Sequence, residues 1–391
     1  MSLFLSRLSL SKLPLRRHLT ARSFSSSSIY YIVGAEPCGS SLKDGDIGNL
    51  KIHPLGGDDR ITEKKVPMNL LKEKGTIGAS HGWVATLNNG VVRLQDDFDP
   101  SASDIDPKRI SLPPLITLPH CQTNIVTNVA MSSSSPKDED CIVAIKFLGP
   151  QLSLCRPAQK NCKWTNIRIT DPGFFSSHVM YSKKNEMFSM PASGGNYTGS
   201  WDLGRHREQP KLQMLRYPEH LSLKDKRYAS IYELADSELV RRVELKFFDS
   251  CCSVEHYLVE SSQTGETFMV KWMTDINPSM KMGRDNWEHF HVLRLDNEGN
   301  AVYTKDFGGV CFFLSKAEPF CLTAACLHDQ RPNCIYHLSD NRIGVTCMDD
   351  QEYVTGAPIT LPVPYWFPLK QPIKSAADPL NEKGLNDIVI D

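Results

Sequence analysis

From Gly75 onward, the chain is a long succession of short apolar segments separated by turn-forming residues. In one of them, residues 83–94, two runs rich in Val and Leu flank the turn Asn88-Asn89-Gly90, which is a strong hairpin signal. Two further hairpins are predicted over residues 252–273 and 290–305, each around a polar turn. Many short strands with frequent turns indicate an all-β sandwich, barrel or propeller.

The length of this pattern favours the propeller. It covers roughly 280 residues, which is long for one sandwich, whereas a propeller uses about 40–50 residues for each four-stranded blade. We therefore expect an all-β fold with a single β-propeller of kelch-like type and about six blades, with seven as the alternative number. No clean repeat of identical residues is visible, so a protein of two sandwiches remains the structural alternative. Residues 228–243 alone have a weak helical pattern.

The expected organisation has four parts: a transit peptide (1–24), a partly irregular N-terminal segment (25–74), the propeller (75–370) and a C-terminal tail (371–391). In the second part, Ile29–Val33 has the composition of a short strand.

Near the other end of the chain, residues 359–367 are apolar but interrupted by prolines. We expect this stretch to supply a closing strand or to cover the edge of the ring. The alternative is a polyproline segment that binds a partner.

The first 28 residues contain nine serines and no acidic residue, and their leucines recur between five Lys or Arg side chains. This composition is typical of an organellar transit peptide. Arg22-Ser23-Phe24-Ser25 resembles a plant mitochondrial cleavage pattern, so we predict a mitochondrial protein, with the chloroplast as the alternative. Removal of residues 1–24 leaves 39 basic and 45 acidic residues, a net charge of −6.

The charge of the chain argues against nucleic acids as partners, and its hydropathy argues against a membrane span. A net charge of −6 is unlike the basic footprint of proteins that bind nucleic acids. The longest stretch without Asp, Glu, Lys or Arg, residues 110–136, contains prolines and a histidine and is too polar for a membrane-spanning helix.

Twelve cysteines occur, but none forms a CxxC pair. A reducing matrix and this spacing argue against a disulfide framework, a zinc ribbon and a thioredoxin-type motif. Most of the cysteines lie in apolar runs, such as Cys141 and Cys311, and are expected to be buried. The vicinal pair Cys251-Cys252 is the one for which we expect oxidation.

Several polar groups have the residue types of functional sites without their full pattern. His289 and His291 share one face of a predicted strand, but no third ligand follows at a suitable spacing, so no metal site is predicted. Ser80-His81 lacks a nucleophile elbow, and His81 is expected to fix a turn. Asp96, Asp97 and Asp99 lack the EF-hand spacing and are expected to form a solvated loop.

The remaining site classes have no support in the sequence. No phosphate-binding glycine loop is present. Six tryptophans are spread at about one per expected blade, which favours blade packing over a sugar-binding surface: Trp83, Trp164, Trp201, Trp272, Trp287 and Trp366. We therefore predict no catalytic, cofactor-binding or metal-binding residues.

Seven segments, in order, carry a resemblance to one known family. They include Gly78-Ala79-Ser80-His81-Gly82-Trp83, Ile110-Ser111-Leu112-Pro113-Pro114-Leu115, Trp201-Asp202-Leu203 and Asn333-Cys334-Ile335-Tyr336-His337. They also include the segments 257–266, 290–314 and 366–368. Together they resemble the plant KIB-type β-propeller family, also known as domain of unknown function 295, over about residues 75–370.

The resemblance implies a propeller and brings no catalytic residue with it. It also implies that Phe290 points inward, which leaves His289 and His291 facing outward. Many family members carry an F-box before the propeller and act as ubiquitin-ligase receptors. Here a transit peptide and a polar segment occupy that place, so the chain resembles the organelle-targeted branch and no ubiquitin-ligase core is expected.

These observations favour a non-enzymatic scaffold that binds an unknown matrix protein. A propeller-based hydrolase or lyase is the alternative, and it would bring acids and histidines together at the central channel. An RNA-associated organellar factor is the third hypothesis. A fold alone does not choose among them.

Overall fold

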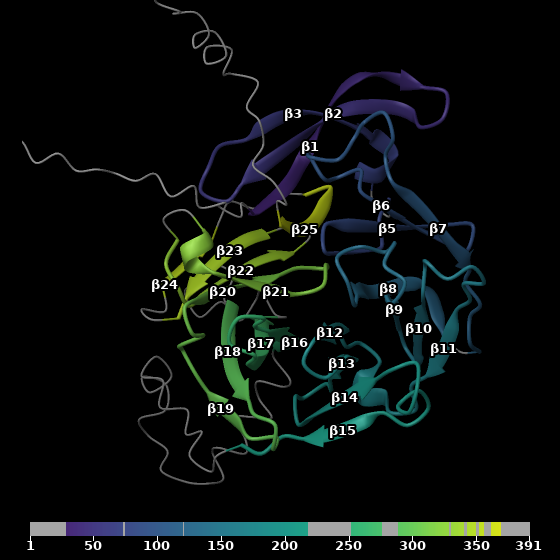
Figure 1. Ribbon diagram of the computed structural model, residues 1–391. Coiled ribbons are helices and arrows are strands. Elements are labelled where there is room, and N and C mark those ends of the chain that lie inside the picture. Colours follow the sequence, from purple (N-terminus) through teal and green to yellow (C-terminus); the bar gives the residue numbers. More distant parts are fainter. Residues whose placement is uncertain are drawn as a thin grey trace, which may run out of the picture.

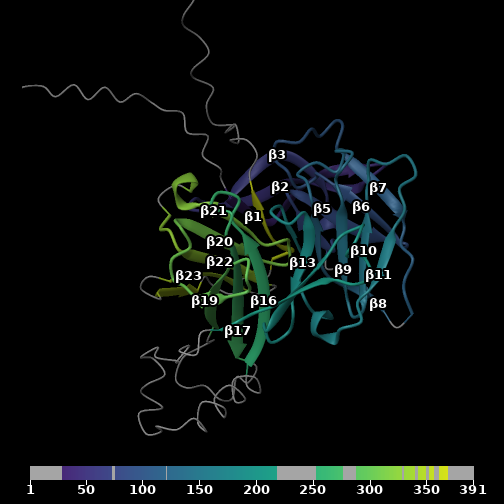
Figure 2. The ribbon, with the colours of Figure 1, turned by 60° about the horizontal axis from the view of Figure 1, so that its bottom comes forward.

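The computed structural model describes residues 29–72, 75–119, 121–217, 252–275, 288–327, 330–339, 342–348, 352–355 and 361–368. Within these ranges the chain forms β-strands and short 3-10 turns, with no α-helix. Six antiparallel or mixed sheets stand around one axis as the blades of a propeller (Figures 1 and 2). The expected all-β, six-bladed fold is confirmed.

Blades 1 to 3 contain the N-terminal half of the described chain. Blade 1 has the strand order β25 (Val363–Pro368), β1 (Ile29–Ser41), β2 (Gly45–Pro54) and β3 (Arg60–Pro67). Blade 2 consists of β4 (Gly78–Ser80), β5 (Trp83–Asn88), β6 (Val91–Gln95) and β7 (Arg109–Pro114). Blade 3 consists of β8 (Gln122–Met131), β9 (Val143–Leu148), β10 (Gln151–Cys155) and β11 (Thr165–Arg168).

Blades 4 to 6 complete the ring. Blade 4 consists of β12 (Met180–Ser182), β13 (Met187–Pro191), β14 (Tyr197–Trp201) and β15 (Lys211–Met214). Blade 5 consists of β16 (Cys252–Glu260), β17 (Thr267–Asp275), β18 (Glu288–Leu295) and β19 (Ala301–Tyr303). Blade 6 has the order β21 (Phe320–Thr323), β20 (Val310–Leu314), β22 (Cys334–Ser339), β23 (Arg342–Cys347) and β24 (Glu352–Thr355).

In the described parts of the chain, three 3-10 turns lie between the strands: η1 (Met68–Leu71), η2 (Pro172–Phe174) and η4 (Ala324–Cys326). No helix among the described residues is long and apolar enough to cross a membrane.

The innermost strands of successive blades contact one another around the axis, from β4 to β8, β12, β16 and β21. Apolar side chains fill the spaces between neighbouring blades. One buried cluster joins β5 of blade 2 to β9 of blade 3, and the next joins β9 and β10 of blade 3 to β13 of blade 4. Each blade therefore buries both of its faces against its neighbours, and the blades cannot fold independently.

The last described strand, β25, closes the ring. It pairs with β1 in antiparallel fashion, with Ile29 opposite Pro368 and Tyr30 opposite Phe367. The prediction that residues 359–367 supply a closing strand is thus confirmed in its main part. The alternative of a polyproline segment does not hold for this strand, because Val363 and Phe367 are fully buried.

The N-terminal segment 25–74 differs from the expectation of a partly irregular chain. Ile29–Pro67 forms the three outer strands of blade 1. The alternation that marks a strand is present in β2, where Leu50 and Ile52 are fully buried. The second half of β1 lacks this alternation, because residues 36–40 are all exposed and include Pro37 and Gly39.

The three hairpins predicted from turn residues are present as β5–β6, β16–β17 and β18–β19. Asn89 and Gly90 have φ angles of +49° and +77°, as a tight Asn-Gly turn requires.

The predicted weak helix 228–243 lies outside the described residues. Five of the six tryptophans are described, and they belong to five different blades or their loops, which supports their expected role in packing.

Cysteine usage differs from the expectation in one place. Cys334 and Cys347 form a disulfide between β22 and β23, with a Cα–Cα distance of 4.1 Å. The strand register places them directly opposite each other, a pairing that their separation of 13 residues does not reveal. Of the free cysteines, Cys141, Cys155 and Cys311 are buried as expected, whereas Cys121, Cys162, Cys321 and Cys326 are only half-buried and Cys38 is exposed. Cys251 and the side chain of Cys252 lie outside the described residues.

Gly195, in the turn before β14, is a position where alanine should be costly. Its φ is +68°, and a Cβ there would lie 2.8 Å from Cε of Lys271 and 3.0 Å from Cδ2 of His256 on blade 5. Gly90 has a similar φ of +77° but open space around it. We expect Gly90→Ala to lower the free energy of unfolding by about 1 kcal/mol through backbone strain, and Gly195→Ala by about 2 kcal/mol through strain and contact. Urea unfolding of both variants checks this, and equal losses would exclude the contact with blade 5.

His256 on β16 makes the stability depend on pH. Burial, and then the charge of Lys271, lower its pKa from 6.5 to about 4. The unfolded chain therefore binds the proton more tightly, so the stabilisation is complete above pH 6.5 and is lost as the pH falls toward 4. This one group should cost up to about 2 kcal/mol at pH 5 compared with pH 8. Urea unfolding of the His256→Gln variant at both pH values should show a correspondingly smaller difference, and an unchanged difference would contradict the assignment.

Candidate functional site

A cavity of about 280 Å³ lies where the inner strands end at one mouth of the ring. Its wall combines the ends of β4, β12, β16 and β25 with the loop 315–319 that leads into β21. Buried Met180 and Trp366 contribute apolar surface, as do the half-buried Phe320 and Leu322. The cavity therefore draws on five of the six blades.

Glu318 is one of the residues that line this cavity. Its Oε2 accepts hydrogen bonds from the Ser80 hydroxyl at 2.5 Å and the Met131 N–H at 3.2 Å, and its Oε1 accepts one from the Tyr181 N–H at 2.8 Å. The Glu318 N–H donates to the Ala79 carbonyl at 2.9 Å. One side chain from blade 6 thus links the inner strands of blades 2, 3 and 4.

Some surroundings of Glu318 raise the pKa of its carboxyl group and others lower it. Burial raises the pKa above its ordinary value, while the charge of nearby His81 and the hydrogen bonds from Ser80, Tyr181 and Met131 lower it. Burial has the larger effect, so the carboxyl group holds its proton more tightly than a glutamate in water.

Glu260, at the end of β16, repeats this arrangement between blades 5 and 4. Its Oε2 accepts a hydrogen bond from the Ser182 hydroxyl at 2.5 Å, and its Oε1 accepts one from the Lys184 N–H at 3.2 Å. The Glu260 carbonyl accepts from the Cys321 thiol at 3.5 Å. Both glutamates at the mouth therefore hold blades together.

His81 lies in the turn between β4 and β5, with a φ of +50°, and Gly82 follows with +81°. His81 thus lies in a blade turn, as expected, and its role in fixing that turn stays a prediction. It also lines the cavity beside Glu318. Lys183 and Ser262 also line the cavity and are exposed.

Deeper in the ring, a second polar group joins blades 4 and 5. The His178 ring lies 4.7 Å from the Tyr257 ring, and the Tyr257 hydroxyl donates to Glu255. Burial lowers the pKa of His178, which keeps its ring neutral. Near it, the Asn128 side chain accepts from the Val179 N–H at 2.9 Å and donates to the Val179 carbonyl at 2.7 Å.

The segment Asp96–Asp99 is not the solvated loop that we expected. Asp96, Asp97 and Asp99 are 5%, 1% and 7% exposed. Arg109 donates to both carboxylate oxygens of Asp97, at 3.0 and 2.6 Å, and also pairs with Asp44 of blade 1. The basic partners that neutralise these acids are therefore supplied by strands that the local sequence does not reveal.

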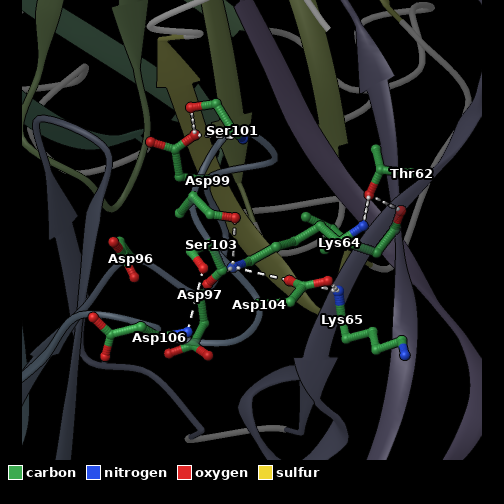
Figure 3. A network of polar contacts seen from close by, with 12 residues as sticks. Thr62, Lys64, Lys65, Asp96, Asp97, Asp99, Ser101, Ser103, Asp104 and Asp106 are labelled. Carbon is green, nitrogen blue, oxygen red and sulfur yellow. Dashed lines mark hydrogen bonds and ion pairs between the residues drawn. The ribbon is translucent and has the colours of Figure 1, made fainter. Parts of the chain in front are cut away.

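Lys64 on β3 completes this network between blades 1 and 2 (Figure 3). Its side chain is 1% exposed, and its Nζ lies 3.2 Å from an Asp104 carboxylate oxygen and from the carbonyls of Ala102 and Ser103. The Asp104 carboxylate also accepts from the Lys65 N–H. Lys64 and Arg109 already supply the positive charges that pair with these acids. The acids therefore join blades 1 and 2.

The strand β18, which carries His289 and His291, lies outside the mouth. Phe290 is buried on β18, as the resemblance implied, and the His291 ring lies 5.8 Å from the Tyr303 ring. The side chain of His289 lies outside the described residues. Among the described residues, no group of three or more His, Cys, Asp or Glu is placed to hold a metal ion.

The alternative of a propeller enzyme predicted acids and histidines at the channel, and the charge of His81 acts on the pKa of Glu318, as that of Glu255 does on the pKa of His178. Sequence reasoning missed Glu318 and Glu260, because their partners are strands far away in the chain. The signals were slight: Glu260 is the last residue of β16, and Glu318 follows the buried strand β20 by four residues.

The family model of the KIB1-4 β-propeller matches residues 52–362. The chain belongs to the KIB1-4 β-propeller family. The match starts inside β2 and ends just before β25, so it covers blades 2 to 6 and the outer part of blade 1 of the KIB-type propeller.

No curated protein sequence matches this KIB-type chain. Solved structures similar to it include the periplasmic gluconolactonase PpgL of Pseudomonas aeruginosa, with 12% identity over 88% of this chain and 99% of that one and a TM-score of 0.31. AztD from Citrobacter koseri has 10% identity over 89% of this chain and 97% of that one, with a TM-score of 0.27. Likenesses this low carry no argument about function.

Proposed function

We propose that this KIB-type propeller is a non-enzymatic scaffold that binds another protein at the mouth of the ring. The observation that supports the proposal is the hydrogen bonding of the two glutamates at the mouth. Every carboxylate oxygen of Glu318 and Glu260 accepts a hydrogen bond from another blade, which holds both side chains in a structural role. A general acid or base needs a free oxygen within reach of a substrate proton.

What the mouth offers instead is a shape for recognition. Trp366, Phe320 and Leu322 give the cavity apolar surface, and Lys183 and Ser262, which also line it, are exposed. Binding sites generally combine an apolar concave surface with a few polar groups that set orientation. A side chain or short loop of a partner fits a cavity of about 280 Å³, whereas a whole domain would rest on the rim.

We further propose that the protein works in the mitochondrial matrix. The support is the composition of residues 1–24, which is rich in Arg, Ser and Leu and free of acids. Import into isolated mitochondria with cleavage near residue 24 would support this location. Import into chloroplasts alone would contradict it.

Affinity purification from plant mitochondria tests the scaffold. Tagged wild-type chain should bring down one or two stoichiometric partners. Lys183→Glu reverses a charge at the rim and should weaken that capture on the order of tenfold. Lys211→Glu makes the same change on exposed β15, far out on blade 4, and should leave capture unchanged.

The other outcomes separate the remaining hypotheses. Equal capture by both variants would contradict recognition at the mouth. Purified protein that hydrolyses or cleaves a small molecule, with loss of that activity in His81→Gln, would favour an enzyme. Salt-sensitive binding of RNA would favour the RNA-associated factor.

A further inference from the structure

The disulfide between Cys334 and Cys347 joins the ends of two neighbouring strands of blade 6. Cys334 is the first residue of β22 and Cys347 the last of β23, and they lie directly opposite each other in the antiparallel pair. Just beyond them, the Met348 N–H donates to the Asn333 carbonyl at 3.0 Å. This bond marks the two cysteines as a non-hydrogen-bonded pair, the kind whose side chains lie closest together. The strand pairing itself therefore brings the two sulfur atoms together.

The two cysteines of this bridge differ in access. Both belong to one apolar cluster, in which Cys334 is 1% exposed and Cys347 is 7% exposed. Only the four-residue strand β24 separates β23 from the outer edge of the blade. Each cysteine lies at the end of its strand, where local opening costs less free energy than in the middle of a sheet. An attacking thiol therefore reaches the sulfur of Cys347 first.

We propose that the Cys334–Cys347 bridge is a reversible site of thiol–disulfide exchange, which a dithiol opens and a small disulfide closes again. Disulfides inside cells are mostly transient or redox-sensing, because their compartment is reducing. The mitochondrial matrix, which we propose as the location, is such a compartment. The backbone pairing of β22 with β23 continues for five residue pairs beyond the cysteines, from Ile335 opposite Thr346 to Ser339 opposite Arg342. Both redox forms therefore fit the same strand register.

The exchange moves two electrons from the dithiol to the bridge. One thiolate of the dithiol attacks the Cys347 sulfur, the S–S bond breaks, and the Cys334 thiolate leaves and takes a proton. The second thiolate of the dithiol then attacks its partner sulfur in the mixed disulfide. The Cys347 thiolate leaves and takes a proton, and the dithiol becomes a cyclic disulfide. A small disulfide closes the bridge by the same two steps in reverse and is itself reduced to two thiols.

The position of the bridge connects it with the wall of the mouth cavity. Tyr336, two residues after Cys334 on β22, meets the edge of the Trp366 ring at a centroid distance of 6.3 Å. Trp366 lines the cavity, and one apolar cluster contains both of these rings and both cysteines. We therefore expect the open form of the bridge to be less stable in the part of blade 6 that supports the cavity wall.

Peptide mapping of the wild-type full chain tests the pairing. Trypsin leaves Cys334 in peptide 317–342 and Cys347 in peptide 343–370. After purification in air and blocking of free thiols, we expect these two peptides as one linked species, and fragmentation should locate the bond at Cys334. Unlinked peptides, or a link from Cys347 to another cysteine such as Cys311 of the same apolar cluster, would overturn the proposal.

Reduction of the folded protein tests the exchange. With dithiothreitol as the dithiol, followed by alkylation, the link should disappear faster than the chain unfolds globally at the same temperature, on the order of tenfold. Oxidised glutathione should then restore the link. Loss of the link only at the rate of global unfolding would show a permanent cross-link and would overturn the proposal.

Cys347→Ser is the matched control for the effect on stability. Dithiothreitol should lower the melting temperature of the wild type on the order of 5 °C, because the unfolded chain regains the freedom of the opened loop. The variant should melt at this lower temperature with or without dithiothreitol. A shift of the same size in Cys347→Ser would contradict the assignment of the effect to this bridge.

Discussion

Replacing Phe367 with alanine is expected to lower the free energy of unfolding by about 4 kcal/mol, within the range for a buried Phe in a well-packed core. Phe367 is fully buried on the closing strand β25. Its ring stacks on Tyr30 of β1 at 5.5 Å and meets the edge of Phe98 at 6.0 Å. The substitution therefore opens a void where β25 pairs with β1 in blade 1.

Guanidinium unfolding followed by tryptophan fluorescence measures this effect. Ile105→Ala serves as the control, because Ile105 is 98% exposed and its loss should change the stability by no more than about 0.5 kcal/mol. If Phe367→Ala lost less than about 1 kcal/mol, β25 would not be a buried closing strand.

Glu318→Ala is expected to cost about 3 kcal/mol, because it leaves the N–H groups of Met131 and Tyr181 without their acceptor. It also removes the partner of the Ser80 hydroxyl. Since these three groups belong to three blades, the variant should lose cooperativity as well as stability. The cavity beside Glu318 admits water, which limits the loss.

Calorimetry of Glu318→Ala beside Glu298→Ala checks this expectation. Glu298 lies exposed in the turn between β18 and β19, so its removal should have little effect. Glu318→Gln should lie between the two, because an amide keeps one acceptor oxygen but turns an NH₂ group toward a donor. A Glu318→Ala variant as stable as the wild type would show that Glu318 does not link the blades.

Local signals in the sequence were enough for the hairpins. The Asn89-Gly90 turn predicted β5–β6, because few residue pairs adopt two positive φ angles. The resemblance to the KIB-type family and the length of the strand-rich region together predicted six blades. Blade 1 was not recognised, because β1 pairs with a strand more than three hundred residues away and its outer half is exposed.

The site could be predicted only in outline. The propeller fold predicted that the mouth of the ring is the functional face. It did not identify Glu318 as a residue of that mouth. Glu318 is one acid in the loop 315–319, and its partners Ser80 and Tyr181 are 238 and 137 residues away. The burial of Asp97 depends in the same way on Asp44 and Arg109 meeting across two blades. Such contacts depend on the assembled ring rather than on a local pattern.

Site-specific photocross-linking tests the central claim, recognition at the mouth, most directly. A benzophenone amino acid would replace Lys183 at the rim in one protein and Lys211 on β15 in another, and both would be irradiated in mitochondria. The scaffold account predicts a covalent adduct with one dominant partner from position 183 and none from position 211. An adduct from position 211 alone, or the same adducts from both positions, would contradict it.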